Sequence, residues 1–356
     1  MKKVPWIWLL LVGCAGTPAA RPADASLAAA RRAEAAGRHQ EASLAYDKAS
    51  REATTDKDRS SFALAAARSA ERAGDTEGSQ MRYEAIAHLR LLDAPAALMR
   101  LAARRQEAGD MEGARAWWTE MLRAHPNDGL ATRALFLYLR DEDSKPDACV
   151  GRLEAMKPVI GGAPPVDLAE ALAYAKAQCL DAQGKGREAI DAYLAVTHDF
   201  PPPSSHYGQE SLLRAAELLE SYGDTQGAIQ RLRELLVQRE HASTIGSYEK
   251  PGYAIALSRI ARLYDEKLHD VAAAKKAWTS LYEDFPDSRL RDDAAFEAAL
   301  LDKRDGGAQA ACKRLQRLKD AHPSSRYVRC ISAWCGDKAT TTCSDYLQRR
   351  WDGSTR

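Results

Sequence analysis

The cysteine with the clearest chemical context is Cys14, which ends the apolar run of MKKVPWIWLLLVGCAG at the start of the chain. A thiolate is a strong nucleophile, so a cysteine at such a boundary is a candidate for covalent modification. Two lysines precede the run. The apolar stretch from Val4 to Val12 is far shorter than the roughly 20 residues of a membrane-spanning helix. A charged start followed by a short apolar region is typical of an export signal.

Residues 11–14, LVGC, resemble the lipobox of bacterial lipoproteins. The resemblance implies cleavage after Gly13, which makes residues 1–13 a lipoprotein signal peptide, and acylation of the Cys14 sulfur, with palmitate as a typical acyl chain. Several acyl chains on one residue anchor a protein firmly, whereas one chain binds marginally. Ala15 is similar to the residue that sends Gram-negative lipoproteins to the outer membrane, so we expect an outer-membrane lipid anchor with the protein facing the periplasm. The alternative is a signal peptide in which Cys14 occurs by chance.

Small residues and prolines follow in AGTPAARPADA, so we expect residues 14–25 to form a lipidated flexible tether. Removal of Lys2 and Lys3 with the signal lowers the formal net charge by two, from +1 to −1. A near-neutral chain argues against nucleic-acid binding, which requires a basic face. No second apolar stretch approaches membrane-spanning length.

Six further cysteines follow Cys14, and an even number in an exported chain suggests disulfides. Cys149 and Cys179 lie at similar distances from the GGAPP loop between them, so an antiparallel helix pair would bring them together. The other four crowd the C-terminus, where they could staple a cap onto the last helices: Cys312, Cys330, Cys335 and Cys343.

Two pairings of these four are open. Cys312 with Cys335 and Cys330 with Cys343 suits two successive helical hairpins, while Cys312 with Cys330 and Cys335 with Cys343 is nearly as good. Buried free thiols are the alternative to both. No C-x-x-C or H-x-x-x-H spacing accompanies the cluster, so we expect no metal site.

Signatures of catalysis are missing from the sequence. GKGRE at Gly184–Glu188 lacks the strand and spaced glycines of a P-loop, and no G-x-S-x-G or H-E-x-x-H motif occurs. Asp292 and Asp293 fall at an expected helix start, where carboxylates favour the positive end of the helix dipole. Trp117 and Trp118 suggest a carbohydrate platform, but Trp118 falls at a packing position. We therefore expect no enzyme activity, no catalytic residue and no cofactor.

A recurring spacing indicates how the chain is folded. A glycine is followed five residues later by a small residue and nine residues later by an aromatic residue or Leu, and Ala lies seven residues before it. Gly37, for example, is preceded by Ala30 and followed by Ala42 and Tyr46. The glycines of the pattern are Gly37, Gly74, Gly109, Gly184, Gly223 and Gly306. Prolines close four of the repeats, at Pro126, Pro201, Pro286 and Pro323.

This pattern resembles the tetratricopeptide repeat family, whose period is about 34 residues. The resemblance implies an all-α fold, a tetratricopeptide-like α-solenoid of antiparallel helix pairs, over residues 26–325. We expect about eight repeats. The fourth, residues 130–156, is degenerate because Cys149 replaces its small residue, and the repeat over 267–286 has about one extra turn residue. Residues 326–356 remain as a Cys-containing C-terminal cap.

The spacing has a physical explanation. Paired helices of about 12–15 residues are marginal alone, so they must pack on their neighbours. Ala at the crossing lets two backbones approach, and the aromatic residue or Leu fills the seam to the next repeat. Gly ends the first helix because it accepts the left-handed conformation, and Pro ends the second because it cannot continue it.

The first helix of each repeat usually faces the concave side of such an array. Counting back from the glycines places these candidate partner-binding residues there: Arg31, Arg68, Tyr174, Gln178, Glu217, Glu220 and Lys303. By analogy with the family, the concave side holds an extended peptide or a partner helix. The alternative is that these are ordinary solvated side chains.

The motif FPDS at residues 285–288, followed by DAAFEAA, is similar to lipoprotein D of the β-barrel assembly machinery and to periplasmic tetratricopeptide proteins. Our leading hypothesis is a lipid-anchored envelope scaffold that binds partner proteins or peptides in outer-membrane or cell-envelope assembly. One alternative is an accessory enzyme or regulator of peptidoglycan or polysaccharide processing. Another is a solute-binding lipoprotein, which needs a closed pocket.

Overall fold

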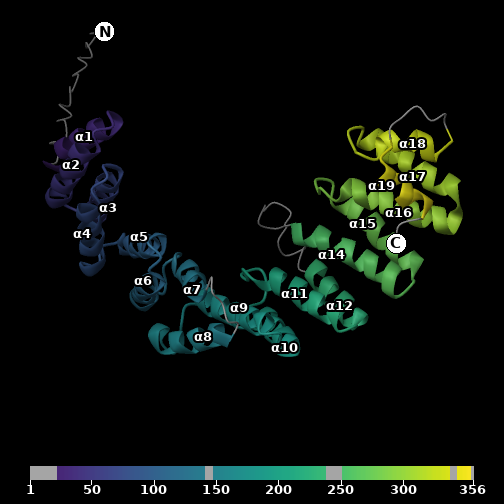
Figure 1. Cartoon of the computed structure of the whole chain (residues 1–356), viewed down its shortest axis with the longest axis horizontal. Helices are drawn as coiled ribbons and strands as arrows, with labels where there is room; N and C mark the ends of the chain where they lie inside the picture. Colours follow the sequence, from purple (N-terminus) through teal and green to yellow (C-terminus); the bar gives the residue numbers. More distant parts are fainter. Residues whose placement is uncertain (1–21, 141–146, 238–250, 337–342, 354–356) are drawn as a thin grey trace, which may run out of the picture. The chain divides into compact units, whose positions relative to one another are not determined.

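The computed structural model describes residues 22–140, 147–237, 251–336 and 343–353. All regular elements in these ranges are helices, so the expected all-α fold is confirmed. The chain divides into two compact units, the N-terminal unit ending at Tyr138 and the C-terminal unit beginning at Leu139. In each unit, successive helices pack side by side as antiparallel pairs (Figure 1). Cys14, the expected signal peptide and the first residues of the expected tether lie outside the described ranges.

The helices of the N-terminal unit are α1 (Pro22–Ala35), α2 (His39–Glu52), α3 (Asp56–Arg72), α4 (Thr76–His88), α5 (Ala94–Glu107), α6 (Met111–Ala124) and α7 (Ala131–Leu139). Helix α1 begins inside the expected tether, whose last residues, 22–25, are therefore helical. Pro22 suits a first helical position, where no backbone N–H is required, and Asp24 lies in the first turn near the positive end of the dipole.

The helices of the C-terminal unit are α8 (Asp147–Ile160), α9 (Val166–Ala182), α10 (Gly186–Asp199), α11 (Gly208–Ser221), α12 (Thr225–Val237), α14 (Pro251–Arg262), the π-helix η1 (Leu263–Lys267), α15 (Val271–Asp284), α16 (Arg291–Gly306), α17 (Ala308–Ala321), α18 (Val328–Trp334) and α19 (Asp345–Asp352). The described helices pair in order up to α16 and α17, and the short α18 and α19 follow as the C-terminal segment.

The turn glycines adopt the expected left-handed conformation. Gly37, Gly74, Gly109, Gly184 and Gly223 have φ between 71° and 79°. The last repeat differs by one residue, because Gly306 ends α16 and the positive φ of 80° belongs to Gly307. The small residues that define the pattern are fully or almost fully buried, as close helix crossings require.

An aspartate fixes the start of several second helices. Asp75 and Asp110 each follow a turn glycine, and each carboxylate accepts a hydrogen bond of 2.8 Å from a backbone N–H three residues later, at Gly78 and Gly113. A Cβ at either of these glycines would lie 2.2 Å from the capping carboxylate. The turn and the cap are therefore one local unit, Gly-Asp-x-x-Gly, which sequence reasoning identified only in part.

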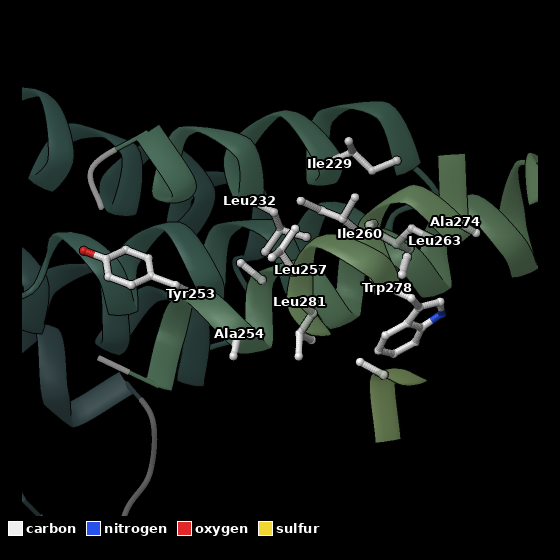
Figure 2. Packing of buried hydrophobic residues seen from close by; sticks show 14 of the residues in the cluster. Ile229, Leu232, Tyr253, Ala254, Leu257, Ile260, Leu263, Ala274, Trp278 and Leu281 are labelled. Atoms are coloured by element: carbon white, nitrogen blue, oxygen red, sulfur yellow. The ribbon is translucent and has the colours of Figure 1, made fainter. Parts of the chain in front are cut away.

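The extra residue of the repeat over 267–286 is absorbed in the backbone. Helix α14 continues into η1, where the Leu268 N–H bonds the Leu263 carbonyl at 3.1 Å, and His269 takes φ of 54° where other repeats have glycine. The core nevertheless stays continuous around this insertion. Figure 2 shows Leu232, Leu257 and Ile260 pointing toward one another between the helices. The π-helix η1 thus preserves the packing register, but it places His269 in the left-handed backbone conformation.

The six cysteines after Cys14 form three disulfides. Cys149 on α8 bonds Cys179 on α9, with a Cα–Cα distance of 5.6 Å. The other pairs are Cys312 with Cys335 and Cys330 with Cys343. These pairs agree with the first of the two expected arrangements, and they tie the C-terminal segment to α17 and α18.

Candidate functional site

A groove of about 390 Å³ opens on the N-terminal unit, and we call it the arginine groove. Its walls come mainly from α3, α5 and α7, the first helices of three successive repeats. Three arginines but a single carboxylate line it, so its charge is positive. The lining residues are Leu64, Arg68, Glu71, Tyr83, Ala96, Met99, Arg100, Ala103, Gln106, Trp118, Leu130, Arg133 and Leu137.

Glu71, Tyr83 and Arg100 form a connected triad in this groove. The Tyr83 hydroxyl donates to Glu71 at 3.0 Å, and Arg100 lies 2.6 Å from the same carboxylate. Glu71 ends the first helix of one repeat, Tyr83 is the seam residue of that repeat, and Arg100 comes from the first helix of the next. The triad therefore bonds one repeat to its neighbour with charge-assisted hydrogen bonds.

Burial and the contacts within the triad shift the pKa values of its three side chains. Burial raises the pKa of Glu71, but hydrogen bonds from Arg100 and Tyr83 outweigh it and leave the pKa below its usual value. Burial and then the Glu71 charge raise the pKa of the Tyr83 hydroxyl to about 12. Hydrogen bonds to Glu71 and Glu107 raise the pKa of Arg100. At neutral pH the carboxylate and the guanidinium are both charged and held together.

Similar triads occur in two other repeats. Arg214 has the same place before its turn glycine as Arg100, whereas the arginine of the first repeat's triad, Arg72, is the last residue of α3. In the first repeat, Tyr46 donates to Glu34 at 2.8 Å and Arg72 pairs with that carboxylate. In the C-terminal unit the members are Asp181, Tyr193 and Arg214, with Tyr193 to Asp181 at 3.4 Å and Arg214 to Asp181 at 2.5 Å. In all three cases the tyrosine follows the acid by 12 residues.

The third repeat carries an altered triad. Gln106 stands where the acid belongs, and Trp118, 12 residues later, stands where the tyrosine belongs. Trp118 is 1% exposed, and its indole nitrogen has no hydrogen-bond partner within the described structure. Arg133 lies on α7 directly before buried Ala134 and Leu135, as Arg100 lies before buried Leu101 and Ala102. Arg133 is exposed, and no hydrogen bond or ion pair joins it to a described residue.

The predicted partner-binding residues do not form one site. Arg68 lines the arginine groove, and Arg31 is exposed on α1. On α9, Gln178 is exposed, while Tyr174 stacks on Tyr207 with ring centroids 4.6 Å apart.

The remaining three predicted residues have partners inside the C-terminal unit. Glu217 and Glu220 bind Arg259 at 2.5 and 3.0 Å. Lys303 donates to the Trp351 carbonyl at 2.5 Å and lies 4.5 Å from the centroid of its ring. These contacts join α11 with α14 and α16 with α19, so these charged side chains stabilise the packing of the helices.

Sequence reasoning missed most of the groove. It named Arg68 but not Arg100, Arg133 or Gln106, because it counted positions from the turn glycine and did not compare repeats side by side. The spacing of 12 between acid and tyrosine was a readable signal. Trp118 is buried as predicted, and Trp117 is half-buried against the core of α3, α4 and α5.

Among the described residues, no group of three or more His, Cys, Asp or Glu side chains is placed to hold a metal ion. The one carboxylate of the groove is already paired, so no convergent acids suggest acid–base chemistry. Within the same ranges, no helix combines the length and apolar character needed to cross a membrane.

Comparison with protein families identifies one segment directly. The family model of the tetratricopeptide repeat matches residues 256–288, which run from within α14 through η1 and α15. This segment is therefore similar to a tetratricopeptide repeat. The helix pairs on either side, α11 with α12 and α16 with α17, share the turn glycine and the buried alanines. A helical-repeat fold of this type typically serves as a scaffold for protein interaction. No curated protein matches the sequence.

Three solved structures are similar to this chain at 15% identity each. BtubC (BKLC) from P. vanneervenii covers 76% of this chain and 92% of its own, with a TM-score of 0.35. The TPR domain of P58(IPK) covers 92% and 89%, with a TM-score of 0.24. The TPR2AB domain in the complex of yeast Sti1 with pHSP90 covers 84% and 98%, with a TM-score of 0.27.

Proposed function

We propose that this protein is a lipid-anchored scaffold of the bacterial cell envelope, active in outer-membrane or envelope assembly, that holds partner proteins or peptides in the arginine groove. The observation that carries the proposal is the groove itself, which is open, positively charged and built from successive repeats. Apolar side chains such as Leu64 and Leu137 alternate in it with Arg68 and Arg133. Such a lining suits an extended peptide with apolar and acidic residues.

Two further features support the location in the envelope. LVGC at residues 11–14 fits lipidation of Cys14, and three disulfides suit an oxidising compartment. Non-reducing peptide mapping of protein taken from cells should recover the three pairs found here. Free thiols at all six positions would argue against export.

The anchor is tested by changing Cys14 to Ser and fractionating cells. We expect the variant to leave the membrane fraction, because the proposed site of acylation is lost. Ala15→Asp is the matched variant, which keeps the acylated cysteine and should move the protein to the inner membrane. Continued membrane retention of Cys14→Ser would remove the anchor from the proposal.

Partner binding is tested by crosslinking in the native envelope. A photoreactive residue at Arg68, inside the groove, should trap a partner protein, whereas the same residue at Arg123, on the other face of α6, should trap far less. Equal products at both positions would indicate nonspecific contact, and the groove would lose its proposed role.

A further inference from the structure

The altered triad of the third repeat is a site with one member missing. In two other repeats of the N-terminal unit, a glutamate accepts from a tyrosine and from an arginine of the following repeat. The third repeat keeps the arginine, Arg133, but has the neutral carboxamide of Gln106 in place of the acid. The arginine is therefore present without its carboxylate.

The donors around this gap have no partner among the residues that the structure describes. The Trp118 indole nitrogen is buried in the groove wall without a hydrogen bond, and Arg133 and Arg68 have no partner among the described residues. A buried donor without a partner is costly, and cations gathered in a groove attract a negative ligand. Arg100 does not fill the gap, because Glu71 and Glu107 already hold it.

We propose that the arginine groove binds a glutamate side chain from an acidic peptide segment of a partner protein, which takes the place of the missing acid beside Arg133. This inference rests on the proposed function and names the chemistry of the partner. The ligand is a side-chain carboxylate because the group that fills this place in the neighbouring repeats is itself a glutamate side chain. The carboxamide of Gln106 can donate to it, and apolar residues on both sides, Leu64 and Leu137, favour leucine-like neighbours in the peptide.

The test uses the full chain and the blocked peptide acetyl-Ala-Leu-Glu-Leu-Ala-amide. Binding is followed by NMR through the shifts of the Trp118 indole N–H and the Arg133 side chain. We expect saturable shifts with this peptide, and binding at least about fivefold weaker with the matched peptide that has Gln in the centre, because a charge-assisted hydrogen bond is lost.

Two substitutions test the geometry. Arg133→Ala should weaken binding of the glutamate peptide about tenfold, while Arg123→Ala, an exposed arginine outside the groove, should leave it unchanged. Gln106→Glu should abolish binding, because the chain then supplies its own carboxylate. Gln106→Glu should also raise the melting temperature of the chain, but it should not do so in the Arg133→Ala background. This difference would show that the new carboxylate pairs with Arg133.

Several outcomes would overturn the inference. They are no saturable shift up to the solubility limit of the peptide, equal binding of the Glu and Gln peptides, or unchanged binding by Arg133→Ala. A version of the peptide with a free C-terminal carboxylate could bind when the blocked peptide does not, or inorganic phosphate could displace the blocked peptide at equal concentration. Either result would identify another anion as the ligand. If these tests fail while crosslinking at Arg68 still traps a partner, the scaffold proposal stands and only the ligand chemistry is wrong.

Discussion

At the scale of single residues, small side chains and paired charges decide how closely the repeats approach. Ala114 on α6 is fully buried at a helix crossing, and Glu71 with Arg100 joins consecutive first helices. A larger side chain at position 114 has no space at the crossing, and loss of Glu71 or Arg100 leaves a half-buried charge unpaired.

Ala114→Leu should lower the free energy of unfolding by about 1–3 kcal/mol, because the added carbons have no space at the crossing. Ala116→Leu, on the exposed side of the same helix, is the control and should cost little. Urea denaturation of both variants measures the difference. Equal midpoints would mean that the register assigned to α6 is incorrect.

Glu71→Gln should lower the unfolding free energy at pH 7 by about 1–2 kcal/mol, since a partly buried charge-assisted hydrogen bond is lost. The folded pKa of Glu71 lies below its ordinary value of 4.5, so this stabilisation is fully present above pH 4.5 and is lost as pH falls through the folded pKa. Denaturation of both proteins over an acid pH series checks this. Glu107→Gln, at an exposed carboxylate on the same arginine, should change stability less.

At the scale of elements, the turn residues determine where the two helices of a repeat end and begin. Gly-Asp-x-x-Gly supplies a left-handed residue and then an N-cap, and the residue before each closing proline leaves the helical conformation. The repeat over 267–286 keeps its packing despite an extra residue because η1 and His269 take up the insertion.

His269→Gly should raise the unfolding free energy by up to about 1 kcal/mol, because glycine adopts the left-handed conformation without the clash of a Cβ. Gly223→Ala, at the equivalent turn of the preceding repeat, should have the opposite effect. Thermal unfolding of the two variants compares them directly. A loss of stability in His269→Gly would show that the imidazole makes a contact worth more than the backbone strain.

At the scale of the whole molecule, helices within each unit pack mainly on their neighbours in sequence, as in α2 with α3 and α16 with α17. Stability in such an array is close to a sum of local interfaces, so damage stays local. The three disulfides add covalent ties within the C-terminal unit.

In the Ala114→Leu variant, the backbone amides of α5 and α6 should therefore lose protection against hydrogen exchange, while those of α16 and α17 keep theirs. The unmodified chain measured at the same pH and temperature is the reference. A uniform loss of protection along the chain would contradict the nearest-neighbour description and indicate a single cooperative core.

The sequence by itself determined the repeat, because Gly, Ala and Pro act through local backbone and steric rules that hold wherever they occur. Gly37, Ala42 and Tyr46 were placed correctly for this reason, and the pairing of Cys149 with Cys179 followed from helix pairing. Only the tertiary structure decided which charges face a partner. Glu217 and Arg68 both count as concave-face residues in the sequence. In the structure, Glu217 binds Arg259, whereas Arg68 has no partner among the described residues, since that outcome depends on which side chain the next repeat presents.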